Sequence, residues 1–150
     1  MPVYVQVDYN PYTSPIGTVQ SCLRFKRAVA TPGSPHKISG IASASCFSAV
    51  CALIRGEPQM IFGNSRNKVP FSRDGVACVH GECNAIWEAM HMADPEMPTI
   101  LEMYIEMHPC EKCAPFLQNA LPAAQTVYYS FPYTPDGVAA WTAAAHALCQ

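Results

Sequence analysis

Two short groups of metal-ligand residues, far apart along the chain, constrain this sequence more than any other feature. The first group is His80-Gly81-Glu82 and the second is Pro109-Cys110-Glu111-Lys112-Cys113. One histidine and two cysteines suit a zinc ion that keeps its fourth coordination position open. A fold that uses both groups must bring two distant segments together around one site.

Each group is predicted to stand at the start of a helix. Residues 82–92 show apolar residues recurring near one face, and Asp94-Pro95 is expected to stop that helix. Pro109 favours a helix start, so we expect the second helix over residues 109–121. Cys110 and Cys113 would then lie on one side of its first turn, where the helix dipole favours thiolates. Two helix N-termini that face each other could therefore supply all three ligands.

The pair Cys110 and Cys113 on its own has two other readings, a redox motif or part of a structural zinc site. Redox chemistry leaves His80 and Glu82 unexplained. A structural site needs a fourth cysteine or histidine, which His108 could supply, although a rigid proline separates it from Cys110. The pattern favours a catalytic zinc site, with Glu82 moving protons rather than binding the metal.

The remaining pattern predicts one α/β domain over residues 1–150. Strands are expected at 3–7, 45–54, 59–62, 100–107 and 126–131, a loop at 63–67 and a final helix at 136–148. Residues 18–27 fit a helix or a strand equally well. Because residues 1–40 are rich in proline, tyrosine, serine and threonine, we expect an irregular N-terminal arm. Strands alternating with helices indicate a layered sheet.

Composition excludes several classes of protein. Half of the residues are hydrophobic and 13% are charged, so a compact fold is expected. No apolar run approaches the roughly 20 residues that span a membrane, and the N-terminus lacks the pattern of a signal peptide. We therefore expect no membrane partner. Cys46, Cys51, Cys78 and Cys83 stand among apolar or small residues, which favours reduced packing residues.

The net charge of −2 hides a strong asymmetry. Residues 1–73 carry a net charge of +6 and residues 74–150 a net charge of −8. A local basic surface can bind nucleic acid even when the whole chain is mildly acidic. The alternative is an ordinary fluctuation of charge along a sequence.

The two metal-ligand groups match the H-x-E and P-C-x-x-C signature of zinc-dependent nucleobase deaminases. Over roughly residues 40–148 the chain resembles the cytidine deaminase superfamily, and it looks most like bacterial toxin-type domains that act on nucleic acid. The resemblance implies a three-layer α/β/α fold, with a mixed central sheet and helices on both faces. It also implies Zn²⁺ held by His80, Cys110 and Cys113, with Glu82 as the catalytic proton carrier. Many members have a fifth strand, which this chain, closing on a helix, would lack or place differently.

The resemblance also suggests substrate contacts. Asn64 matches an asparagine that contacts the sugar or base in many members, although an asparagine in a Gly-Asn loop also serves its own turn. His108 is expected to touch a phosphate or the base, or else to face solvent. Phe131 or Tyr133 is expected in the pocket, because a flipped base is held by aromatic stacking.

The sequence thus favours a zinc-dependent hydrolase that deaminates cytosine to uracil in DNA, single- or double-stranded. Three basic residues between Asn64 and His80 could contact backbone phosphates: Arg66, Lys68 and Arg73. The alternatives are a deaminase of a free nucleoside or nucleotide, or of RNA, and a non-catalytic zinc domain, which an intact Glu82 disfavours. If the chain is a toxin domain, an immunity protein is an expected partner and a target cell its destination; otherwise a cytoplasmic location is expected.

Overall fold

The computed structural model describes residues 1–30, 45–65, 71–73, 76–78, 81–111 and 113–150, with backbone alone described at 71–73, 76–78 and 81–83. The secondary-structure elements alternate as expected for an α/β protein. In chain order they are β1 (Val3–Gln6), α1 (Gly17–Ala30), β2 (Phe47–Ile54), β3 (Glu57–Asn64), β4 (Phe71–Arg73), β5 (Val76–Cys78), α2 (Gly81–Ala93), β6 (Thr99–Met107), α3 (Cys113–Ala120), β7 (Thr126–Phe131) and α4 (Pro135–Leu148).

A five-stranded mixed sheet forms the centre of the molecule, with the order β1-β7-β6-β2-β3. Strands β1, β7 and β6 run parallel. Strand β2 runs antiparallel to both β6 and β3. The carboxyl ends of β1, β6 and β7 therefore lie at the same end of the sheet, which is where ligands bind in open α/β sheets.

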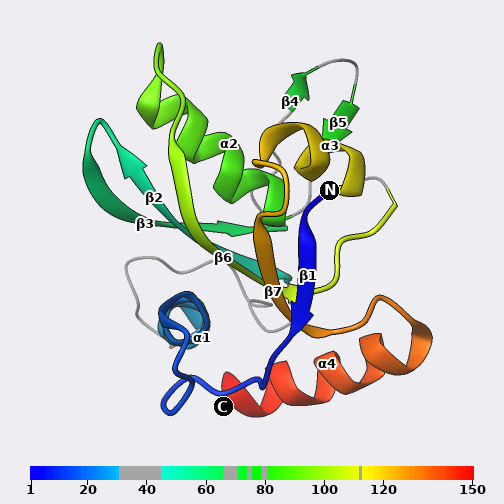
Figure 1. Cartoon of the computed structure of the whole chain (residues 1–150). Coiled ribbons are helices and arrows are strands. Elements are labelled where there is room, and N and C mark those ends of the chain that lie inside the picture. Colours follow the sequence, from blue (N-terminus) through cyan, green and yellow to red (C-terminus); the bar gives the residue numbers. More distant parts are fainter. Residues whose placement is uncertain (31–44, 66–70, 74–75, 79–80, 112) are drawn as a thin grey trace.

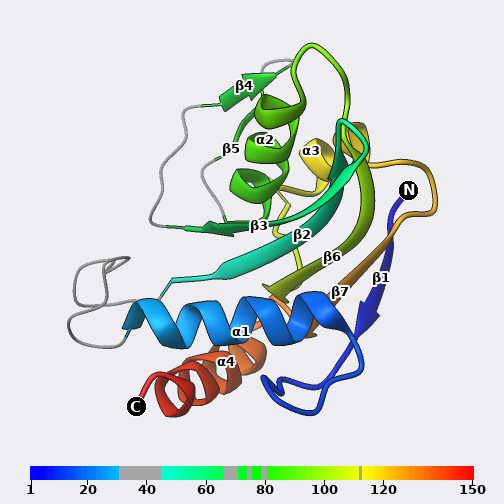
Figure 2. The same ribbon diagram turned by 90° about the vertical axis from the view of Figure 1, so that its left-hand side faces the viewer.

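The helices cover both faces of this sheet. Figures 1 and 2 show α2 and α3 on one face and α1 and α4 on the other. Alternating side chains explain the two layers: Val50 and Met103 pack toward α2 and α3, whereas Ala49 and Tyr104 pack toward α1. The three-layer α/β/α prediction is confirmed.

Within residues 1–30 the N-terminal segment is more regular than the arm expected over residues 1–40, of which residues 31–40 lie outside the described part of the chain. The strand expected at residues 3–7 is present as the edge strand β1, and residues 17–30 form a full helix. This result settles the choice left open for residues 18–27, because Val19, Cys22, Leu23 and Val29 recur at helical spacing and are buried. The fifth strand of the sheet is thus supplied by the N-terminus.

Three further features differ from the sequence prediction. Helix α3 begins at Cys113 and not at Pro109. Strand β3 continues through Asn64, where a loop was expected, because it pairs in full with β2. A short hairpin of β4 and β5 was not predicted at all, since three-residue strands carry little periodic signal. Among the described residues no helix is long and apolar enough to cross a membrane, and the cysteines described there form no disulfide.

A buried ion pair joins the N-terminal segment to the sheet. Lys26 of α1 and Glu106 of β6 are both 0% exposed, with Nζ 2.8 Å from Oε1. Three further groups donate to the same carboxylate: the Phe47 N–H, Trp141 Nε1 and the Tyr9 hydroxyl. Burial, and then the charge of Glu106, raises the pKa of Tyr9 far above its ordinary value, so this hydroxyl keeps its proton. The carboxylate is thus compensated as a buried charge must be.

Candidate active site

Two cysteine sulfurs come together where β6 leads into α3. The backbone N–H groups of Cys113 and Ala114 donate to the Cys110 carbonyl at 3.1 and 3.0 Å, which closes a helical turn. Although the assigned helix begins at Cys113, the two cysteines share this turn, as their spacing predicts. Their Sγ atoms lie 3.6 Å apart, with Cys113 buried and Cys110 half-buried.

This separation fits a zinc ion. Two sulfurs bound at ~2.3 Å to one tetrahedral zinc lie about 3.8 Å apart. His80, the expected third ligand, lies outside the described residues. Within the part of the chain that the structure describes, no three histidine, cysteine, aspartate or glutamate side chains come together to hold a metal. The distance between the two sulfurs therefore supports Cys110 and Cys113 as zinc ligands and does not test His80.

The start of α2 supplies the other half of the candidate site. Glu82 is the second residue of α2, and its side chain is not among those described. Helices α2 and α3 contact each other on one face of the sheet, and Ala85 and Ile86 share a core cluster with Cys113. Asn84 Nδ2 donates to the Asn64 carbonyl at 2.6 Å, which ties the end of β3 to the first turn of α2.

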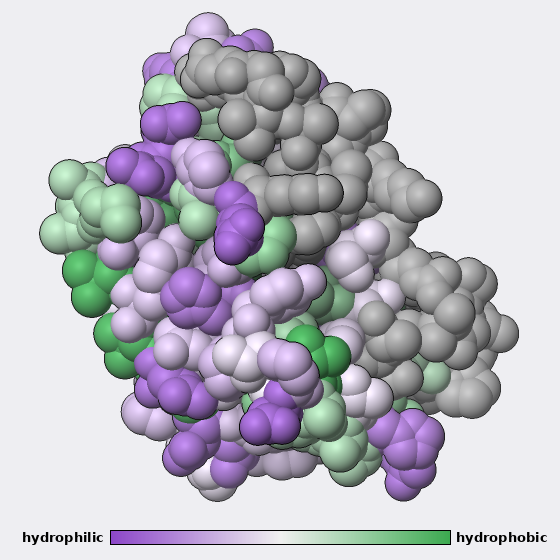
Figure 3. Space-filling view, turned by 90° about the vertical axis from the view of Figure 1, so that its right-hand side faces the viewer, coloured by the Kyte–Doolittle hydropathy of each residue, from purple (hydrophilic) through white to green (hydrophobic). Residues whose placement is uncertain are grey.

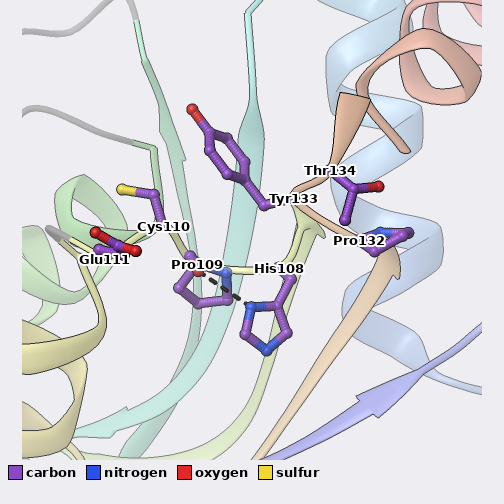
Figure 4. A pocket seen from close by; sticks show the side chains of 7 residues that line it. All are labelled: His108, Pro109, Cys110, Glu111, Pro132, Tyr133 and Thr134. Atoms are coloured by element: carbon purple, nitrogen blue, oxygen red, sulfur yellow. Dashed lines mark hydrogen bonds between the residues drawn. The ribbon is translucent and has the colours of Figure 1, made fainter. Parts of the chain in front are cut away.

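A pocket of about 650 Å³ opens beside Cys110. The loop after β6 forms the first wall, with His108, Pro109, Cys110 and Glu111. The loop after β7 forms the second wall, with Pro132, Tyr133 and Thr134. Figure 4 shows Tyr133 extending from the second wall toward the side on which Cys110 and Glu111 lie. The volume is within the range of ligand-binding pockets. A ligand in this pocket would therefore sit next to a candidate zinc ligand.

His108 forms part of the pocket wall and is held on several sides. Its backbone N–H donates to the Phe131 carbonyl at 2.8 Å, and its Nδ1 lies 3.0 Å from the Pro109 carbonyl. Because a carbonyl oxygen only accepts, this contact places the proton on Nδ1. The ring centroid is 4.5 Å from that of Tyr4 and 4.9 Å from that of Tyr129. The ring is thus fixed by neighbours from β1 and β7.

The two aromatic candidates for the pocket lie in different environments. Tyr133 is 58% exposed and lines the pocket. Phe131 does not line it; it packs with the cluster of Met107 and Trp141, and its ring centroid lies 5.1 Å from that of Tyr9. Tyr129, two residues earlier in β7, packs on the opposite side of the sheet with α2 and α3, so the side chains do not alternate regularly at the end of β7.

The second pocket wall is fixed by the start of α4. The Thr134 side chain caps the helix by accepting from the Gly137 N–H at 3.0 Å, and Pro135 occupies the first turn. A Cβ added to Gly137 would lie 1.9 Å from the Pro132 carbonyl oxygen. Only glycine allows this close approach of α4 to the loop that lines the pocket.

The remaining predicted site residues are placed only in part. Asn64 ends β3 and is 3% exposed. Arg66 and Lys68 lie outside the described residues, and only the backbone of Arg73 is described, in β4.

Three residues near the pocket were not predicted. Glu111 lies within the Pro109–Cys113 motif, but nothing in the sequence indicates a role for it. Thr134 carries a recognisable signal, since threonine before proline is a common helix start. Tyr4 carries none, because nothing local indicates that β1 pairs with the distant strand β7.

The arrangement combines a pair of cysteine sulfurs, an adjoining pocket and a helix start that carries a glutamate. Such a site can bind zinc and can act on a ligand held in the pocket.

Comparison with known proteins identifies the family. A family model described as the cytidine and deoxycytidylate deaminase zinc-binding region matches residues 37–130, more than half of the chain. No curated protein and no solved structure gives a significant match. The matched range includes His80, Glu82, Cys110 and Cys113. The chain therefore belongs to the zinc-binding cytidine and deoxycytidylate deaminase family and is a hydrolytic deaminase.

Proposed function

We propose that this deaminase acts on cytosine in DNA, single- or double-stranded. Water adds at C4 of the ring, ammonia leaves and uracil remains. The observation that carries the proposal is Tyr133, a largely exposed aromatic side chain at the pocket beside Cys110. A base turned out of a nucleic acid is held by stacking on such side chains.

The proposed roles divide between two helix starts. His80, Cys110 and Cys113 hold zinc, which when bound lowers the pKa of water and polarises the substrate. Glu82 takes one proton from the attacking water and delivers it to the ring nitrogen, and it then moves the remaining hydroxyl proton to the amine, which leaves as ammonia. The 3.6 Å sulfur separation supports Cys110 and Cys113 as two of the ligands.

The charges around the pocket restrict the path of a nucleic acid. Glu111 is exposed on the first wall, so phosphates would avoid that side. The base would enter between Tyr133 and His108, with the backbone outside. Arg66, Lys68 and Arg73 come between the end of β3 and the start of α2, and we propose that they contact that backbone.

Asn64 and His108 are proposed to contact the substrate in different ways. Asn64 is buried beside the first turn of α2, so it would contact the part of the substrate that lies deepest in the site. Because Nδ1 of His108 is engaged by the Pro109 carbonyl, Nε2 is the ring nitrogen that remains to contact the substrate, at the base or at a phosphate.

A free nucleoside or nucleotide is the second candidate substrate, because the matched family description names cytidine and deoxycytidylate. RNA is a further alternative. The surface around the pocket loops does not decide between them: Figure 3 shows this side of the molecule as a mixture of hydrophilic and hydrophobic residues, without a broad hydrophobic area among the coloured atoms.

The resemblance to toxin-type domains leads to a biological proposal. The domain would act as a bacterial toxin inside a target cell, with an immunity protein as its inhibitor. Expression in cells that lack uracil repair should then raise C-to-T mutations. No increase over a Glu82→Ala control would contradict this role.

The substrate is tested by offering the same enzyme each candidate. Zinc-loaded protein is incubated separately with single-stranded DNA, duplex DNA, RNA, cytidine and deoxycytidylate, and the products are weighed by mass spectrometry. Glu82→Ala controls for contaminating activity. We expect uracil in at least one form of DNA. Rapid turnover of cytidine or deoxycytidylate without uracil in either DNA would assign the second candidate instead.

A further inference from the structure

An exposed patch of one tyrosine and two arginines lies on the outer side of α1. Tyr12 is 55% exposed, and Arg24 and Arg27 are exposed on α1 three residues apart. The Arg24 and Arg27 guanidinium carbons lie 5.5 and 6.0 Å from the centroid of the Tyr12 ring. These three residues are called the Tyr12 patch below.

The loop beneath the Tyr12 patch is held in shape by hydrogen bonds. The Asn10 side-chain oxygen accepts from the backbone N–H groups of Tyr12 and Thr13 at 2.9 and 3.0 Å. Arg24 Nε donates to the Pro11 carbonyl at 2.9 Å, and Arg27 Nη1 donates to the Tyr12 hydroxyl. The arginines are thus held against the loop and keep less rotational freedom than ordinary surface arginines. Binding a ligand would therefore cost less side-chain entropy.

The charge of this region is positive at the surface. Within residues 1–30 the basic side chains are Arg24, Lys26 and Arg27, and the only acidic one is Asp8. Lys26 is paired with Glu106 in the core. The outward charge of α1 therefore comes from the two arginines of the Tyr12 patch.

The patch belongs to the same edge of the sheet as the pocket. The loop that carries Tyr12 follows β1, which runs parallel to β6 and β7, and the pocket loops follow those two strands. Lys26, between the two arginines in α1, contacts Glu106, two residues before His108. Figure 2 shows α1 and α4 on the same face of the sheet; the end of α4, at Leu148, packs with the core cluster of α1, whereas the pocket wall precedes the start of α4.

We propose that the Tyr12 patch binds the phosphate backbone of the polynucleotide outside the catalytic pocket. This inference rests on the proposed action on DNA. Arginine suits the contact because its guanidinium forms paired hydrogen bonds with phosphate oxygens while its face stacks on an aromatic ring. Positive charge beside an aromatic side chain is typical of surfaces that bind nucleic acid without sequence preference. A free nucleoside bound in the catalytic pocket has no phosphate backbone that could contact the Tyr12 patch.

The test compares arginines near opposite ends of the sheet. Arg24→Ala and Arg27→Ala are matched with Arg55→Ala, which removes one charge from the β2–β3 turn at the other end of the strands. Binding to a cytosine-free single strand and to an A·T duplex is measured over a range of salt concentrations. Thermal melting and zinc content confirm that each variant is folded, and turnover of free cytidine is followed in parallel.

Each arginine that contacts a phosphate contributes about 0.9 to the log–log salt slope for duplex DNA and about 0.7 for a single strand. Arg24→Ala and Arg27→Ala should each lower the slope by that amount and weaken binding roughly fivefold to eightfold at 0.1 M salt. Arg55→Ala should leave the slope unchanged, and none of the three should alter turnover of free cytidine.

The outcomes separate the two proposals. If the unaltered protein binds DNA with a steep salt slope and the Tyr12 patch variants keep that slope, this inference fails while the action on DNA stands. If the unaltered protein neither binds nor deaminates DNA, both fail. An equal effect of Arg55→Ala would indicate diffuse attraction by net charge and would also overturn the assignment.

Discussion

At the scale of single residues, the thiol pair carries the clearest prediction. Cys113 is completely buried and its sulfur lies 3.6 Å from that of Cys110. Cys113→Ala should reduce bound zinc well below one ion per chain and lower the melting temperature, because a three-ligand site loses a ligand and metal binding stabilises the folded state. Elemental analysis and calorimetry measure both effects. Cys149→Ala, at the end of α4, is the control and should keep its zinc; full zinc retention by Cys113→Ala would remove Cys113 from the ligand set.

Glu82 separates the chemistry from the fold. Glu82→Ala should fold and bind zinc yet lose about 10²–10⁴-fold or more in turnover, as expected for a general acid–base group. Glu88→Ala, on the exposed side of the same helix, should remain active. Turnover and zinc content are measured on the same preparations. Near-normal deamination by Glu82→Ala would contradict the assigned mechanism.

The sequence predicted some of these residues and not others for a physical reason. The spacing of Cys110 and Cys113 is a local property, since one helical turn brings the two sulfurs together. The difference between Phe131 and Tyr133 is not local. It depends on how the end of β7 meets Tyr9 and Trp141, which are distant in sequence.

At the scale of secondary-structure elements, the Lys26–Glu106 pair holds α1 on the sheet. Removing one partner leaves the other charge buried without its counter-ion, so Lys26→Met or Glu106→Leu should each lower the free energy of unfolding by about 3–5 kcal/mol. The double variant should lose less than the sum because no charge remains buried, although the Phe47 N–H, Trp141 Nε1 and the Tyr9 hydroxyl then lose their acceptor. Urea denaturation measures all three. Additive losses would show that the two residues act independently.

Gly137 fixes the distance between α4 and the pocket loop. Its missing Cβ would meet the Pro132 carbonyl oxygen at 1.9 Å, so Gly137→Ala must displace backbone. We expect a loss of about 1–3 kcal/mol in stability, despite the better helix propensity of alanine, and a raised KM. Gly17→Ala is a matched control at the start of α1, where the Cβ would meet Glu102 Oε1 at an ordinary 3.9 Å. A stable Gly137→Ala enzyme with unchanged KM would contradict this account of the pocket wall.

Most elements that carry chemistry were predictable, because α2, β6 and β7 have strong periodic patterns. The N-terminal elements were predictable only in part. The strand expected at residues 3–7 is confirmed as β1, but residues 18–27 fitted a helix or a strand, and a buried Lys26 runs against the usual exposure of lysine. Only the pairing of β1 with β7 and of Lys26 with Glu106 makes these residues part of the core.

At the scale of the whole molecule, the mixed sheet explains why the site is where it is. Parallel β6 and β7 bring the turn that carries Cys110 and the loop that carries Tyr133 to one pocket, and the loop after β1 leaves the same end of the sheet toward α1 (Figure 1). Helix α2 begins on the face covered by α3, where it can add Glu82. Metal, proton carrier and stacking side chain are therefore expected at a single edge that a long substrate can approach.

The most direct test of the central claim is a competition between substrates in one reaction. Zinc-loaded protein receives an oligonucleotide with a single cytosine together with free cytidine and deoxycytidylate, all at equal concentration, and the uracil formed in each is quantified by mass spectrometry. Single-stranded and duplex oligonucleotides are tested in turn. The account predicts that uracil appears first and most abundantly in at least one form of DNA. Preferential conversion of free cytidine or deoxycytidylate, with both forms of DNA unchanged, would contradict it.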